Sequence, residues 1–209
     1  MNIVFSTSYF PNIEYVRKTL FSSNIYIENY EFYERHSYRN KTQILGANGI
    51  ILLTVPIKKC KSNTIINKIE IADQKWQTNH IKSIKSAYGS APYFIHYFPE
   101  IQNIINTKHK YLIDLNNHIL NYIYKVFNIN ITIHQTKSYE NQMVCYDKDF
   151  RFQRIKENNL KKIPPYQQVL FNHKNKIKHV SFFHNLSCLD ILFNLGPNTH
   201  KYLQDLKIK

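Results

Sequence analysis

The sequence predicts an α+β protein, in which a single domain over residues 1–209 holds a mixed β-sheet flanked by helices. Three observations predict this class. Short runs of β-branched and aliphatic residues alternate with longer stretches in which apolar residues recur at helical spacing. No linker, internal repeat or change of composition marks a boundary between two domains. A chain of 209 residues is also long enough to bury one hydrophobic core.

The expected strands are short and rich in β-branched residues. Simple strands are predicted at residues 3–6, 25–27, 69–71 and 129–133. A hairpin is predicted to begin at Ile44, turn at residues 46–49 and return through residues 50–55. The returning run, Ile-Ile-Leu-Leu-Thr-Val, is apolar at almost every position, which predicts a central strand.

The expected helices carry capping residues or a clear apolar face. Asn12, Asp73 and Ser187 are predicted to cap helices that end near Ser23, at Tyr88 and at Leu195. Further helices are predicted at residues 93–106, 110–127 and 198–206. Residues 135–168 show no period, and a segment of this length in a compact domain is typical of a lid or a binding loop.

The formal net charge of +14 has two explanations. An anionic partner is one, whether a nucleic acid, a membrane surface or a phosphorylated metabolite. Coding bias toward Lys, Ile, Asn and Tyr is the other, and the scattered lysines favour it. No pattern of an RNA- or DNA-binding fold is present and no apolar run is long enough to span a bilayer. We therefore expect neither a nucleic-acid partner nor a membrane span.

The three cysteines and the first residues bear on the cellular compartment. An odd number of cysteines without close spacing argues against disulfides and a zinc site, and we expect no metal. The N-terminal run lacks the basic leader and the apolar region of a signal peptide. We therefore expect a cytoplasmic protein.

The densest polar cluster is the segment 30–40, Tyr-Glu-Phe-Tyr-Glu-Arg-His-Ser-Tyr-Arg-Asn. It holds two carboxylates, two arginines, a histidine and four aromatic residues, and no apolar period explains it as core. One interpretation is the wall of a binding or catalytic site. The other is a solvated hairpin whose ion pairs neutralise one another.

The side chains of this segment suit several tasks. Glu31 and Glu34 suit a base or a cation ligand. The planar fork of Arg39 suits a carboxylate or phosphate. Tyr33 and Tyr38 suit stacking on a sugar or base ring.

His80 lies on the apolar face of the predicted helix, one turn after Trp76. It is either a core histidine bonded to a backbone carbonyl or a proton carrier that faces a pocket. The glycine-rich phosphate loop and the known nucleophile and zinc motifs are absent from the sequence.

The chain resembles the WbqC-like family in its Bacteroidetes-type form. The resemblance runs in order along almost the whole chain, and its pieces include Tyr9-Phe10-Pro11, Glu31-Phe32-Tyr33, Tyr38-Arg39-Asn40, Gly46-Ala47-Asn48-Gly49, Trp76 with His80, Ser86-Ala87-Tyr88, Asp114-Leu115-Asn116, Asp149 with Arg151, and Asn185-Leu186-Ser187. One departure is Lys41, which stands where the family usually has a further Arg. Lysine keeps the charge but not the fork geometry.

The resemblance implies a bacterial enzyme or accessory factor of O-antigen-type surface-polysaccharide biosynthesis. The transferase activity that it implies joins a glycine-like acyl group to an amino sugar. The implied partners are a sugar nucleotide or amino sugar and an acyl donor, and the resemblance leaves the cofactor open. The expected catalytic residues are Glu31, His80 and Arg39. The expected substrate-binding residues are Tyr9, Tyr33, Tyr38, Asn40 and Tyr88. The alternative is a non-catalytic module that binds a glycan or a partner protein.

Overall fold

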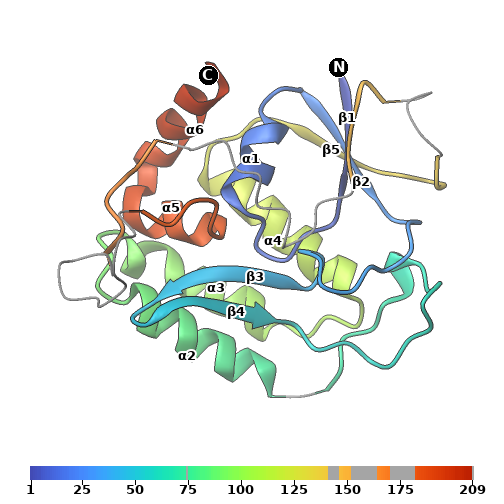
Figure 1. Ribbon diagram of the computed structural model, residues 1–209, viewed down its shortest axis with the longest axis horizontal. Helices are drawn as coiled ribbons and strands as arrows, with labels where there is room; N and C mark the ends of the chain where they lie inside the picture. Colours follow the sequence, from blue (N-terminus) through green and yellow to red (C-terminus); the bar gives the residue numbers. More distant parts are fainter. Residues whose placement is uncertain (74, 141–145, 152–163, 170–181, 209) are drawn as a thin grey trace.

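The computed structural model describes residues 1–73, 75–140, 146–151, 164–169 and 182–208. It confirms the α+β class, with parallel and antiparallel strands in two separate sheets (Figure 1). The strands are β1 (Asn2–Ser6), β2 (Asn24–Glu28), β3 (Lys41–Gly46), β4 (Gly49–Thr54), β5 (Thr132–Gln135) and β6 (Lys148–Phe150). The four-stranded sheet is parallel throughout and has the order β5-β2-β1-β6, whereas β3 and β4 form an antiparallel hairpin.

The helices pack around one hydrophobic core, which contains residues from β1 to α6. They are α1 (Ile13–Thr19), α2 (Trp76–Tyr88), α3 (Phe94–Asn106), α4 (Leu112–Val126), α5 (Cys188–Leu195) and α6 (Thr199–Ile208). Helices α1, α5 and α6 contact one another, and the hairpin lies between α5 and α2 (Figure 1). Within the described part of the chain, no helix has the length and apolar character that crossing a membrane requires.

Two of the three predicted helix caps are confirmed. The Asn12 side chain accepts a hydrogen bond from the Tyr15 N–H, and the Ser187 hydroxyl accepts one from the Leu189 N–H. The prediction for Asp73 was wrong, because α2 begins at Trp76 and its N-cap is Lys75, which makes no capping bond through its side chain. Asp73 therefore lies outside the cap position.

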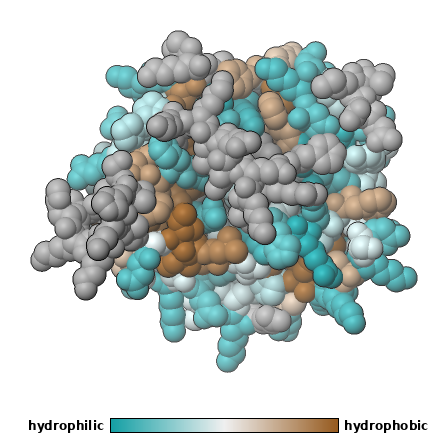
Figure 2. All heavy atoms as spheres, in the orientation of Figure 1, coloured by the Kyte–Doolittle hydropathy of each residue, from teal (hydrophilic) through white to brown (hydrophobic). Residues whose placement is uncertain are grey.

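The run 50–55 is not a central strand. Among the described strands β4 pairs only with β3, and Ile50, Ile51 and Leu52 are exposed. Figure 2 shows hydrophobic side chains gathered over this hairpin. An apolar run indicates a strand, but it does not tell a central strand from one whose face is uncovered.

Two other parts of the chain differ from the expected pattern. The predicted strand at 69–71 forms only isolated bridges, of Ile71 with Ile57 and of Glu70 with Tyr111. Most of the predicted lid or binding loop over 135–168 lies outside the described residues. Its described part contains β6, a strand of three residues that the sequence does not predict.

The order of the parallel strands determines where a site is expected. Strand β1 lies between β2, which follows it along the chain, and β6, which comes much later. The chain therefore leaves β1 toward one side and returns on the other. In open parallel sheets, ligands bind outside the carboxyl ends of the strands at such a point.

Candidate functional site at the carboxyl edge of the parallel sheet

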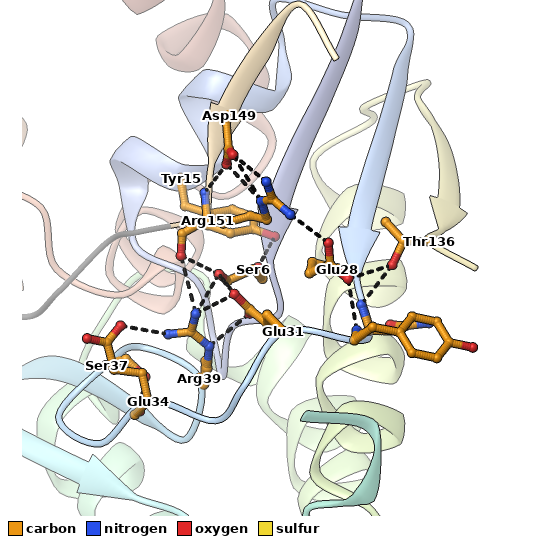
Figure 3. Close-up of polar contacts among 12 residues, drawn as sticks. Ser6, Tyr15, Glu28, Glu31, Glu34, Ser37, Arg39, Thr136, Asp149 and Arg151 are labelled. Atoms are coloured by element: carbon orange, nitrogen blue, oxygen red, sulfur yellow. Dashed lines mark hydrogen bonds and ion pairs between the residues drawn. The ribbon is translucent and has the colours of Figure 1, made fainter. Parts of the chain in front are cut away.

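Each parallel strand supplies a polar residue at its carboxyl end. Ser6 is the last residue of β1 and Glu28 the last of β2, while Thr136 follows β5 and Arg151 follows β6. Figure 3 shows these side chains in two connected clusters of ion pairs and hydrogen bonds. The carboxyl edge of the sheet thus carries a continuous polar network.

The first cluster is centred on Arg151. Its Nη1 lies 2.9 Å from Oε2 of Glu28, and its Nη2 lies 2.6 Å from Oδ2 of Asp149. The Thr136 hydroxyl donates to Oε1 of Glu28 at 2.8 Å. Only 1% of Arg151 and 0% of Glu28 is exposed. Burial lowers the pKa of the Arg151 guanidinium, but its hydrogen bonds to the carboxylates of Asp149 and Glu28 outweigh burial and raise the pKa above its ordinary value.

The second cluster is a two-pronged pair between Arg39 and Glu31. Nε of Arg39 lies 2.9 Å from Oε1 of Glu31, and Nη2 lies 2.5 Å from Oε2. Glu34 lies farther out, with Oε2 at 3.5 Å from Nη1 of Arg39. Burial raises the pKa of the Glu31 carboxyl group above its usual value, and the hydrogen bonds from Arg39 and Ser6 oppose that rise.

The two clusters meet at Ser6 and at the main chain of Arg151. The Ser6 hydroxyl lies 3.0 Å from both Oε2 of Glu31 and Nη2 of Arg39, and it also contacts the Arg151 carbonyl oxygen. Nη2 of Arg39 donates to the same carbonyl at 3.3 Å. A change in one cluster therefore alters the hydrogen bonds of the other.

Backbone hydrogen bonds hold the segment 30–40 in place. The Ile66 N–H donates to the Glu31 carbonyl at 2.9 Å, and the Tyr33 N–H donates to the Thr64 carbonyl at 2.9 Å. From α4, the Asn116 amide donates to the Arg39 carbonyl at 2.8 Å. These contacts fix the loop and so orient the Arg39–Glu31 pair.

A hollow of about 590 Å³ opens beside the second cluster. Volumes of this size are typical of small-molecule sites. Four aromatic residues line it, namely Tyr30, Phe32, Tyr33 and Tyr139. Its other lining residues are Glu31, Glu34, Arg35, Arg39, Cys60, Lys61 and Ser62. Phe32 is 61% exposed, which makes its ring available to a ligand.

The structure brings several of the expected site residues together. Glu31, Arg39 and Tyr33 line the hollow. The Tyr33 hydroxyl donates to Oδ1 of Asn40 at 3.0 Å, so Asn40 lies directly behind Tyr33. Tyr38 is buried, and it lines a separate small cavity together with Arg39.

Tyr9 and His80 form a separate buried pair. The Tyr9 hydroxyl lies 2.8 Å from Nδ1 of His80, and Nε2 of His80 lies 3.2 Å from the Thr54 carbonyl oxygen. Burial lowers the pKa of His80 to about 4, and the hydrogen bond to the Thr54 carbonyl opposes this shift. A neutral ring satisfies both contacts if Nδ1 accepts from Tyr9 and Nε2–H donates to Thr54. His80 is not among the described residues that line the hollow.

Tyr88 lies next to α5, apart from both the hollow and the Tyr9–His80 pair. Its hydroxyl accepts a hydrogen bond from the Leu45 N–H at 3.4 Å. Burial, and then the nearby Asp190, raise the pKa of Tyr88 well above its ordinary value. The expected site residues thus fall into three groups, of which one borders the hollow.

Sequence reasoning missed much of the polar edge. Glu28 gave no signal, because its importance depends on which strand ends meet. Thr136 and Tyr139 were covered only by the expected lid or binding loop over residues 135–168, and Tyr139 does line the hollow. Asp149 and Arg151 belong to the pattern of the resemblance, but the sequence around them predicts no strand. No group of three His, Cys, Asp or Glu side chains in the described residues is placed to hold a metal ion.

These features define an α+β protein with a polar, aromatic-lined hollow at the carboxyl edge of a parallel sheet. The sequence model of the WbqC-like protein family matches residues 7–157, and the chain belongs to this family. The matched range includes Arg39 and Arg151 together with their partners Glu31 and Glu28. No curated protein and no solved structure gives a significant match to the chain.

Proposed function

We propose that the protein acts in the biosynthesis of a cell-surface polysaccharide and binds a sugar substrate in the hollow beside Arg39 and Glu31. The observation that carries this proposal is the lining of the hollow, where four aromatic rings stand next to carboxylates and cations. Sugars suit such a lining, because their apolar ring faces pack on aromatic side chains while their hydroxyl groups bond charged groups. Membership of the WbqC-like family supports the same class of role.

The proposed chemistry is transfer of an acyl group to an amino sugar. The amine nitrogen attacks the carbonyl carbon of an activated acyl donor, and a carbon–nitrogen bond forms as the donor's leaving group departs with its electron pair. A base takes the proton from the nitrogen. Of the two bases expected from the sequence, Glu31 lines the hollow, whereas both ring nitrogens of His80 are engaged inside the protein. The proposal therefore assigns proton transfer to Glu31, whose pKa burial raises.

The alternative function is a non-catalytic module that binds a glycan. The Arg39–Glu31 pair favours it, since both carboxylate oxygens of Glu31 already accept hydrogen bonds from Arg39. A Glu31→Gln variant separates the two functions. It removes the base and keeps one of the two side-chain acceptors for Arg39, so an enzyme loses turnover while a binding module, shown by circular dichroism to be folded, keeps its ligand.

Phe32→Ala is expected to reduce the function of the protein in cells. Loss of a stacking ring costs about 0.5–1.5 kcal/mol, which corresponds to about two- to tenfold weaker binding. The measurement is mass spectrometry of the surface glycan from a deletion strain that carries the wild-type gene or a variant. Ile95→Ala is the matched control, because Ile95 on α3 is 72% exposed and is not among the residues lining the hollow.

The expected result has three parts. Deletion removes an acyl substituent from the glycan, the wild-type and Ile95→Ala genes restore it, and Phe32→Ala restores less of it. An unchanged glycan in the deletion strain would contradict a role in polysaccharide biosynthesis. Equal restoration by Phe32→Ala and Ile95→Ala would contradict the placement of the sugar in this hollow.

A further inference from the structure

A second hollow, of about 340 Å³, adjoins the first. Tyr33, Arg35 and Cys60 line both, so these three residues form the boundary between them. A ligand that fills the first hollow can therefore extend into the second without crossing the protein core.

The second hollow differs from the first in charge. Its basic lining residues are Arg35, His36, Lys41, Lys58 and Lys59. None of the described residues that line it carries a carboxylate, whereas Glu31 and Glu34 line the first hollow. The charge in this place is thus of one sign.

Most of these cations are not neutralised by the protein. Lys58 pairs with Glu70 at 2.7 Å, but Arg35, Lys41 and Lys59 form no ion pair with any residue in the described ranges. Nζ of Lys41 lies 3.5 Å from Nδ1 of His36, which points these two side chains at each other. Unneutralised cations around a hollow raise the local concentration of an anionic ligand.

The floor of the second hollow is fixed by hydrogen bonds. The Asn40 amide donates to the Val55 carbonyl at 2.8 Å, and the Val55 N–H donates to the Asn40 carbonyl at 2.8 Å. The Tyr33 hydroxyl donates to the same Asn40 side chain at 3.0 Å. These hydrogen bonds hold the backbone that carries the cations in one conformation. Less conformational entropy is therefore lost when a ligand binds there.

We propose that the second hollow binds the phosphate-bearing end of the substrate whose sugar lies in the first hollow. This inference rests on the proposed function, because it extends the same site. A phosphate fits the forked guanidinium of Arg35 and the point charges of Lys41 and Lys59. A sugar phosphate and a nucleoside diphosphate share this chemistry, and their common feature is a phosphate next to a sugar.

The experiment is isothermal titration calorimetry on the full chain with four probes: glucosamine, its 1-phosphate, uridine diphosphate and inorganic pyrophosphate. The site variant is Arg35→Gln with Lys59→Gln. The matched control is Lys82→Gln with Lys85→Gln, which removes the same charge from two exposed positions of α2. Comparing the sugar 1-phosphate with uridine diphosphate shows which kind of carrier the site prefers.

The site variant is expected to bind the three phosphate probes about tenfold more weakly, since it loses two charge-assisted contacts. The control variant is expected to change these affinities less than about twofold, as screened surface charges do. Equal weakening in both double variants, or no weakening in either, overturns the phosphate site. These outcomes are separate from the glycan experiment, because Phe32→Ala is expected to weaken the binding of glucosamine and to leave the binding of pyrophosphate unchanged.

Discussion

Replacing Arg151 by methionine is expected to lower the free energy of unfolding by about 3–5 kcal/mol. The guanidinium bonds Glu28 and Asp149 at the carboxyl edge of the sheet. Glu28 is 0% exposed, and without Arg151 its charge stays buried with no ion-pair partner among the described residues. Breaking a buried ion pair by removing one partner is among the most destabilising single changes.

Urea denaturation at pH 7 measures this effect, with two variants for comparison. Lys82→Met removes an exposed cation from α2 and is expected to change the free energy of unfolding by less than about 0.5 kcal/mol. Glu28→Gln combined with Arg151→Met removes both charges, so it is expected to be more stable than Arg151→Met alone. If the single and double variants were equally destabilised, lost packing rather than an uncompensated charge would be the cause.

The proton equilibrium of His80 alone is expected to lower the free energy of unfolding by about 2 kcal/mol as the pH falls from 7 to 5. Its pKa in the folded protein is about 4, below the ordinary value of 6.5. Between these two values the unfolded chain binds the proton and the folded protein does not, so acid favours unfolding. The stabilising contribution is therefore complete above pH 6.5 and is lost as the pH falls toward 4.

His80→Gln tests this pH dependence. Glutamine keeps a donor and an acceptor for Thr54 and Tyr9 but does not titrate. Urea denaturation at pH 7 and at pH 5 gives the free energy of unfolding that each protein loses between the two pH values. The loss in the wild type minus the loss in the variant is the contribution of His80. An equal loss in the variant and the wild type would show that His80 is not held neutral by burial.

The sequence predicts those parts of the fold in which one stretch carries the whole signal. β1 is a buried apolar run, α4 has a continuous apolar face, and Asn12 and Ser187 cap helices within their own segments. β6 escaped prediction, because three residues are too few for a period and its pairing with β1 is supplied by a distant part of the chain. The start of α2 was misplaced because Asp73 has the right chemistry but lies too early in the chain.

The same distinction explains the site. Glu31 and Arg39 lie eight positions apart, so their pairing was visible in the local density of charge in the segment 30–40. Glu28 and Arg151 are 123 positions apart, and only the order of the strands brings them together. His80 fits the interpretation of a core histidine bonded to a backbone carbonyl, here that of Thr54, whereas its second partner, Tyr9, comes from a distant part of the chain.

Hydrogen exchange followed by mass spectrometry, with and without glucosamine 1-phosphate, tests the central claim that the hollow beside Arg39 and Glu31 is the substrate site. Slower exchange is predicted in residues 30–40 and 57–62, which line the two hollows. Phe32→Ala is predicted to reduce that protection, and Ile95→Ala to leave it unchanged. Protection confined to α2, which carries His80 and Tyr88, or the absence of protection at saturating ligand, would contradict the claim.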